Sequence, residues 1–113
     1  MEKSKLLCLC SKYLNHFGYI ILTMTGKSML PSLGPGQKIV IRKCAISNIQ
    51  KGDIVAYKFF SNEHITIHRV IDVIGIDSYT VLQTKGDANS YKDKYIVDSS
   101  TFLGKAEVFK QVL

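Results

Sequence analysis

Six short stretches of the chain are rich in β-branched and aromatic residues, and several of them alternate apolar with polar side chains. That alternation is the period of a strand with one buried face. Turn-forming residues separate the stretches at 31–36, 51–53, 61–62, 75–78 and 86–94. The pattern therefore predicts six strands: Tyr19–Thr25, Lys38–Arg42, Asp53–Phe60, Ile65–Ile74, Tyr79–Thr84 and Phe102–Phe109.

The beginning of the chain has a different period, because its apolar side chains recur every three or four residues, as on one face of a helix. They are Leu6, Cys10, Tyr13, Leu14 and Phe17. We expect an N-terminal amphipathic helix over residues 1–18, ended by Gly18, and a single β-rich domain over residues 19–113. The apolar face is expected to pack on the domain's own core. The alternative is a peripheral membrane contact, in which residues 1–17 lie on an anionic bilayer.

Composition agrees with one folded domain, since the 113 residues are 46% hydrophobic and 21% charged. Short strands without a second long helical pattern predict a mainly β fold, a small antiparallel β-barrel or sandwich with one N-terminal helix. The net charge is +6, and residues 1–51 carry +7 of charge while the remainder carries −1. This asymmetry suits an anionic partner, although a charge that only aids solubility explains it equally well. A basic nucleic-acid-binding domain is disfavoured, because aromatic residues do not interleave with the lysines and arginines in a known pattern.

Neither a transmembrane segment nor a cleavable signal is expected. The longest uncharged stretch, Tyr13–Gly26, has 14 residues, whereas a spanning helix needs about 20. The apolar run Leu6–Cys10 is too short for a signal peptide. The expected location is therefore cytoplasmic or peripheral to the membrane. The three cysteines form no Cys-x-x-Cys pair, which predicts reduced thiols, and no metal or cofactor motif is present.

Two residues could form a nucleophile and its base. Ser28 lies between a predicted strand and a turn that contains Pro31, so its hydroxyl could stand at the rim of the sheet near free backbone N–H groups. A serine nucleophile needs a base, and His68 on a predicted strand is the best candidate. Each residue alone is more often structural, and 40 positions separate them. Lys27 is a poor alternative base, because adjacent side chains of a strand point to opposite faces.

A third group must orient the histidine, and two aspartates follow the fifth predicted strand. Asp87 lies in a Gly-Asp-Ala-Asn turn, where aspartate commonly bonds nearby backbone. Asp93 comes after the turn and is free to reach a histidine. Asp93 is therefore the better candidate, and Asp87 stays open as an alternative.

An ordered set of six short motifs resembles the type I signal peptidases, in particular the Ser-His branch of the endoplasmic reticulum, archaea and some spore-forming bacteria. The resemblance covers about residues 20–109. The motifs are Gly26-Lys27-Ser28-Met29-Leu30-Pro31, Gly34-Pro35-Gly36-Gln37, Lys51-Gly52-Asp53-Ile54-Val55, His68-Arg69-Val70-Ile71, Thr84-Lys85-Gly86-Asp87-Ala88-Asn89 and Phe102-Leu103-Gly104-Lys105-Ala106.

The resemblance implies roles for individual residues. Ser28 matches the nucleophile, His68 stands where the bacterial branch has a lysine base, and Asp93 matches the aspartate that completes the triad. Asp87 matches the turn residue that supports the site. Met29 and Pro31, from the Ser-Met-x-Pro box, match the substrate and oxyanion side of the site. The family implies a β-rich peptidase fold, without cofactors, that cleaves leader peptides after small side chains.

The sequence also departs from the family. Family members usually carry a transmembrane anchor, Gly26 replaces a serine of several branches, and Ala88 stands where asparagine is common. With Gly26, the segment Gly26-Lys27-Ser28-Met29 also resembles the Gly-x-Ser-Met box of the self-cleaving SOS repressors, which share the fold but use a lysine base. The expected function is a serine endopeptidase similar to signal peptidase I, acting on a peptide or preprotein. The alternatives are a peptide-binding module with weak catalysis and a basic nucleic-acid-binding β domain.

Overall fold

The computed structural model describes residues 12–59 and 64–110 of the chain. Its elements are β1 (Tyr19–Thr23), β2 (Lys38–Arg42), the 3-10 helix η1 (Ile46–Asn48), β3 (Ile54–Tyr57), β4 (Thr66–Ile76), β5 (Tyr79–Lys85) and β6 (Phe102–Val108). All six predicted strands are present, with shifted ends. The turn predicted at 75–78 shrinks to Asp77 and Ser78, because Asp77 adopts a φ of 54° and two residues then suffice for the β4–β5 hairpin.

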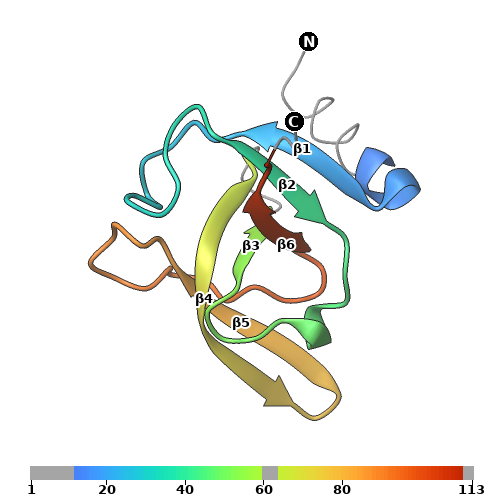
Figure 1. Cartoon of the computed structure of the whole chain (residues 1–113). Coiled ribbons are helices and arrows are strands. Elements are labelled where there is room, and N and C mark those ends of the chain that lie inside the picture. Colours follow the sequence, from blue (N-terminus) through green and yellow to red (C-terminus); the bar gives the residue numbers. More distant parts are fainter. Residues whose placement is uncertain (1–11, 60–63, 111–113) are drawn as a thin grey trace.

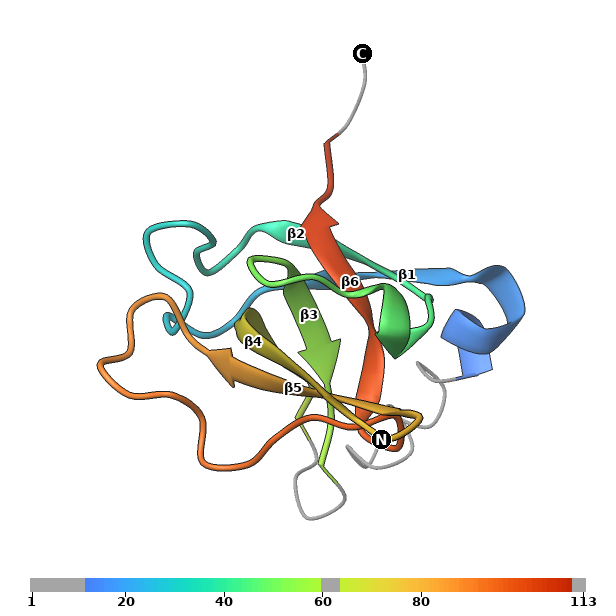
Figure 2. The ribbon, with the colours of Figure 1, turned by 90° about the horizontal axis from the view of Figure 1, so that it is seen from below.

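One antiparallel sheet organises the molecule, with its strands in the order β1-β2-β6-β3-β4-β5 (Figure 1). The mainly β prediction is confirmed. Within the described residues β1 and β5 are edge strands that do not pair with each other, so the sheet is open and the barrel prediction is too strong. The strong twist seen in Figure 2 instead gives a sandwich-like β fold.

Both faces of the sheet bury apolar side chains, because successive residues of a strand point to opposite faces. On β3, Ala56 belongs to a cluster with Met29, Ile39 and Ile41, whereas Val55 and Tyr57 belong to a second cluster with Val70 and Leu82. Two small cores therefore sandwich the central strands, and β3 and residues 66–70 of β4 are mostly buried between them.

The predicted N-terminal helix is described only in part. Residues 12–17 are helical, and Gly18, with a φ of 82°, ends the turn through a hydrogen bond from its N–H to the carbonyl of Leu14 at 2.8 Å. Leu14 is buried in the first cluster, as predicted. Tyr13 and Phe17 stack on each other and stay more than half exposed, so the prediction that they pack on the core is wrong. Leu6 and Cys10 lie outside the described residues. In the described part of the chain, no helix is long and apolar enough to cross a membrane.

Gly104 on β6 gives a test of the sheet packing. A Cβ atom at this position would overlap the carbonyl of Arg42 on β2 and approach Ile41, so β2 and β6 would have to separate. We expect Gly104→Ala to lower the free energy of unfolding by about 1–3 kcal/mol, the usual cost of overpacking. Urea denaturation monitored by circular dichroism measures this loss.

Gly75 provides the matched control, because it also lies in a strand but a Cβ there would meet nothing within 4 Å. Gly75→Ala should leave stability unchanged or raise it by about 0.5–1 kcal/mol, since glycine is a poor strand residue. Equal destabilisation by both substitutions would contradict the close approach of β2 and β6.

Candidate active site

The loop between β1 and β2 carries Ser28 to one end of the sheet. Its next residue, Met29, is fully buried in the first apolar cluster and anchors the loop. Leu30 N–H bonds to the carbonyl of Lys27 at 3.2 Å, which tightens the turn around Ser28. The Ser28 carbonyl in turn accepts a hydrogen bond of 2.8 Å from Ala88 N–H, on the loop after β5. Ser28 is thus fixed from both sides while the residue remains partly exposed.

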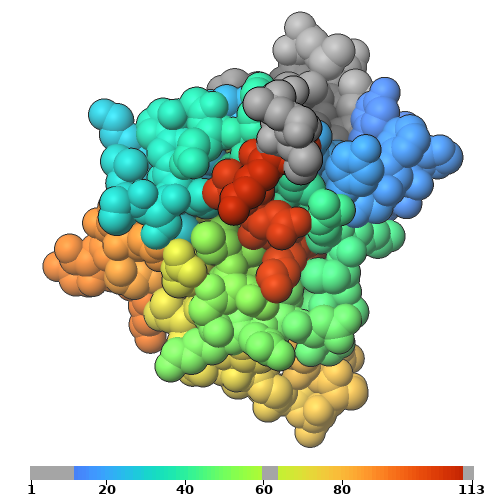
Figure 3. Space-filling view, in the orientation of Figure 1, coloured from blue at the N-terminus to red at the C-terminus, as the bar shows by residue number. Residues whose placement is uncertain are grey.

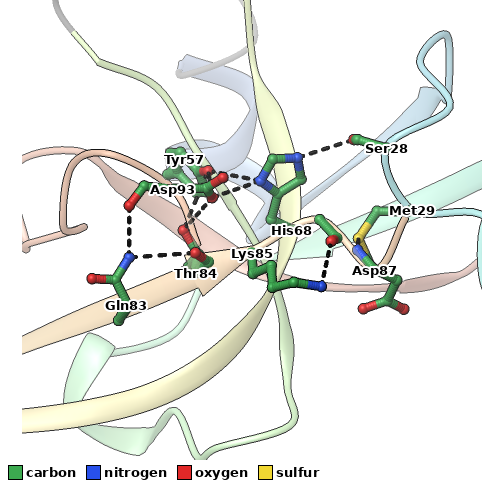
Figure 4. Close-up of polar contacts among 10 residues, drawn as sticks. Ser28, Met29, Tyr57, His68, Gln83, Thr84, Lys85, Asp87 and Asp93 are labelled. Atoms are coloured by element: carbon green, nitrogen blue, oxygen red, sulfur yellow. Dashed lines mark hydrogen bonds and ion pairs between the residues drawn. The ribbon is translucent and has the colours of Figure 1, made fainter. Parts of the chain in front are cut away.

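His68 points from β4 toward Ser28, as Figure 4 shows. It lies opposite Val55 in the register of β3 and β4, so its ring stands on the face of the second apolar cluster. The imidazole Nε2 is 3.0 Å from Ser28 Oγ, and the residue is only 8% exposed. β5 pairs with β4 only from Arg69 onward, which leaves the side of β4 at residues 66–68 open for the serine loop.

Asp93 completes a continuous chain of hydrogen bonds. Its Oδ2 is 2.6 Å from His68 Nδ1, so Nδ1 carries a proton and Nε2 is left as an acceptor for the Ser28 hydroxyl. Asp93 lies on the loop after β5. Its backbone N–H donates a hydrogen bond of 2.8 Å to the carbonyl of Thr84 on β5, which holds the residue in place. Burial raises the pKa of the Asp93 carboxyl, but hydrogen bonds from His68, Thr84 and Tyr57 outweigh it and leave the pKa below its usual value. Asp93 is therefore a carboxylate at neutral pH.

Asp87 has a different position from Asp93 and does not contact the histidine. Its two carboxylate oxygens accept two hydrogen bonds of 2.8 Å from Arg69, the residue after His68, and Ser32 Oγ donates a third at 2.7 Å. The bond from Arg69 holds the pKa of the Asp87 carboxyl below its usual value. Arg69 also donates to the carbonyl of Gly52 at 2.9 Å. Asp87 therefore ties the serine loop, β4 and the loop after β5 together.

Met29 and Pro31, expected on the substrate and oxyanion side, take separate places. Met29 faces inward and its sulfur accepts the N–H of Asp87 at 3.4 Å, so it supports the site from below. Pro31 is exposed on the outer part of the loop, after a cis Leu30–Pro31 bond. Within the described part of the chain, the N–H of Ser28 itself donates no hydrogen bond, so it is available to bind an oxyanion.

A groove of about 210 Å³ runs past Ser28 between two extended segments. One wall is the end of β1 and the residues after it, and the other is the start of β4. Its lining residues are Leu22, Thr23, Met24, Thr25, Gly26, Ser28, Ile65, Thr66 and Ile67. Gly26 has open space where a side chain would stand. The groove is therefore open and bordered by extended backbone that a peptide could follow.

A mainly apolar hollow lies elsewhere in the described part of the chain. It is formed by the helical residues 12–17 and β1, and Tyr13, Phe17 and Tyr19 are among its lining residues. Figure 3 shows these helical residues on the opposite side of the surface from the loop after β5. No nucleophile or base lines this hollow, so we place the candidate active site at Ser28. In residues 12–59 and 64–110, no group of three or more His, Cys, Asp or Glu side chains could hold a metal. Cys44 is a free, half-buried thiol.

The structure thus brings Ser28, His68 and Asp93 together from a loop, a strand and a second loop, and places Asp87 beside them. It also adds the hydroxyls of Tyr57 and Thr84, which both bind Asp93. Tyr57 lies in none of the six motifs, and Thr84 opens the fifth motif but had been given no role there. Both residues lie on strands that flank the histidine strand, and for Tyr57 this position was the only signal in the sequence. No protein-family model matches the chain, and no curated protein sequence is significantly similar to it.

Proposed function

We propose that this protein is a serine endopeptidase of the signal peptidase I kind, with Ser28 as nucleophile, His68 as general base and Asp93 as the residue that orients His68. The observation that carries the proposal is the continuous hydrogen-bonded chain from Ser28 Oγ through both ring nitrogens of His68 to Asp93, at 3.0 and 2.6 Å. It stands at the mouth of a groove bordered by extended backbone. The ordered motifs described above support the same assignment.

The geometry suits acyl transfer in two steps. Ser28 Oγ attacks the peptide carbonyl carbon while His68 Nε2 takes the serine proton, and Asp93 stabilises the resulting imidazolium. His68 then gives this proton to the leaving amine as the C–N bond breaks. Water attacks the acyl ester, His68 accepts its proton, and the proton returns to Ser28 Oγ as the acid product leaves. The N–H of Ser28 is placed to stabilise the oxyanion in both steps.

The groove also bears on the substrate. The start of β4 has β3 on one side only, so the backbone of an extended peptide could pair along its open side. The preference for small side chains near the scissile bond is what the resemblance to the signal peptidases implies. The proposed substrate is therefore an extended peptide with small side chains near the scissile bond, as in the leader peptides that the resemblance implies.

The test is cleavage of a peptide panel followed by mass spectrometry. Wild-type protein is incubated with peptides that contain Ala-x-Ala, and with matched peptides in which leucine replaces both alanines. We expect cleavage after the second alanine, and a rate for the leucine peptides lower by roughly 10–200-fold, the range that misfit of a small apolar group produces. Vesicles are added in a parallel series to test whether a lipid surface changes the rate.

Two results would contradict the proposal. Equal cleavage of both peptide sets would show that small side chains are not selected. Binding of the peptides without any cleavage would favour the second candidate, a peptide-binding module of the same fold, because the groove would then be used without the serine.

A further inference from the structure

One oxygen of Asp93 receives three hydrogen bonds, and the proteolytic mechanism proposed above uses only one of them. Oδ2 is 2.6 Å from His68 Nδ1, 2.7 Å from the Tyr57 hydroxyl and 2.6 Å from Thr84 Oγ1 (Figure 4). Tyr57 is 2% exposed and Thr84 is fully buried. Burying two hydroxyl groups costs free energy unless they are bonded, so this arrangement calls for an explanation.

The two hydroxyls hold the carboxylate from both strands that flank β4. Tyr57 comes from β3 and Thr84 from β5. The backbone of Asp93 is held as well, because its carbonyl accepts a hydrogen bond of 2.9 Å from Gln83 Nε2. A carboxylate oxygen that accepts three donors must be ionised and cannot turn away without breaking all three bonds.

The Tyr57 hydroxyl lies near two possible acceptors for its proton, because it is 2.7 Å from Asp93 Oδ2 and 3.2 Å from His68 Nδ1. It has one proton, and Nδ1 already carries its own, so the proton goes to the carboxylate. Burial raises the pKa of Tyr57, which keeps the hydroxyl a donor at every pH at which a peptidase would work. Phe59 and His68 pack edge-on against its ring and fix its orientation.

Other charges near His68 are engaged elsewhere. Arg69, the neighbour of His68 on β4, is bonded to Asp87, and Lys85 at the end of β5 donates to the carbonyl of Gly86 at 3.2 Å. On the side of the serine loop, Ser28 is the group that faces the ring. Asp93 and its two hydroxyl donors are therefore the groups that decide how strongly the imidazolium is stabilised.

We propose that Tyr57, assisted by Thr84, is a positioning residue for the proposed proteolysis: it fixes Asp93 against His68 Nδ1 and takes up part of the carboxylate charge, which limits how strongly Asp93 holds the His68 imidazolium. Without this sharing, the full charge of Asp93 would act on the imidazolium and His68 would hold its proton more tightly. The proposal rests on the proposed function for its catalytic meaning, but the effect on the histidine exists independently of any cleavage.

Tyr57→Phe tests this, because it removes only the hydroxyl and keeps the ring. Two quantities are measured: the pH dependence of kcat/KM for an Ala-x-Ala peptide, and the pKa of His68 by NMR titration in a Ser28→Ala background. We expect both the acidic limb and the histidine titration to move upward by about 0.5–1 pH unit, as the loss of one shared hydrogen bond to a charged group implies. His68→Gln identifies the His68 signal among the three histidines.

Thr84→Val is a second variant, which removes the hydroxyl and keeps the branched shape of the side chain, and it keeps the test valid if Tyr57→Phe fails to fold. It should shift both quantities in the same direction. Thr101→Val is the matched control, because it removes a buried hydroxyl whose hydrogen bonds go to Asp98, away from the histidine. It should shift neither.

The outcomes separate the two proposals. A folded Tyr57→Phe protein with an unchanged or lowered His68 titration would overturn the role of Tyr57, whatever the cleavage rate. An upward titration shift in a protein that cleaves no peptide would support the role of Tyr57 in setting His68 and overturn the proteolytic function. A lower rate without any movement of the acidic limb would mark Tyr57 as a packing residue only.

Discussion

Ser28→Ala is expected to lower kcat/KM for cleavage of an Ala-x-Ala peptide by about 10⁶-fold, which leaves only the catalysis due to binding and oxyanion contacts. The reason is that Ser28 Oγ is the only hydroxyl bonded to His68 Nε2 among the described residues, at 3.0 Å. Removing this atom removes the acyl-enzyme route, whereas the groove and the His68–Asp93 pair stay in place. Long incubations with mass spectrometric detection give the sensitivity needed for such a loss.

Ser90→Ala is the matched control for this experiment. Ser90 is an exposed serine on the loop after β5, between Asp87 and Asp93. Its loss should change kcat/KM by less than about threefold, as for a surface substitution. Cleavage that persisted unchanged in Ser28→Ala would mean that a different nucleophile, or a contaminating protease, cuts the peptide.

The strands could be predicted from the sequence because each depends on local information. Lys38–Arg42 is predicted to the residue, and the other strands are correct in their centres. Their ends differ because pairing partners decide them. β1 stops at Thr23, after which Met24 still donates its N–H to the carbonyl of Gln37 and accepts the N–H of Gly36, but no further residue continues the pairing with β2. The open edge of the sheet was also beyond prediction, since closure depends on whether β1 and β5 meet.

The candidate site was predictable only in its residue types. Ser28, His68 and Asp93 could be selected as nucleophile, base and orienting acid, but only the fold could place a residue from a loop within 3.0 Å of one 40 positions away. The turn pattern favoured Asp93 over Asp87, but Asp87 stayed open because its pairing with Arg69 is a contact that no local pattern contains. In the sequence, Tyr57 and Thr84 look like ordinary core residues of strands. Their role becomes visible only in the fold, where both hydroxyls bond to Asp93.

His68→Gln is expected to lower kcat/KM by about as much as Ser28→Ala, roughly 10⁶-fold, and the double variant should lose no more than either single variant. A glutamine amide is similar in size and can bond to both neighbours, but it cannot accept the serine proton. Because Ser28 and His68 act on one proton, losing either removes the same route. If Ser28 and His68 acted independently, their contributions to transition-state stabilisation would add, and the double variant would lose more activity than either single variant. An equal loss of kcat/KM in all three variants would therefore show that the two residues act as one unit.

His16→Gln is the control, since His16 is exposed on the helical residues 12–17, and it should retain wild-type activity. The His68→Gln protein must also stay folded for this comparison to be valid. Asp93 would lose the Nδ1 donor but keep Tyr57 and Thr84, so the buried carboxylate remains bonded and the fold should survive. A His68→Gln protein that unfolded would show that the imidazole is needed to hold Asp93. A folded one that still cleaved at more than about a hundredth of the wild-type rate would exclude His68 as the base.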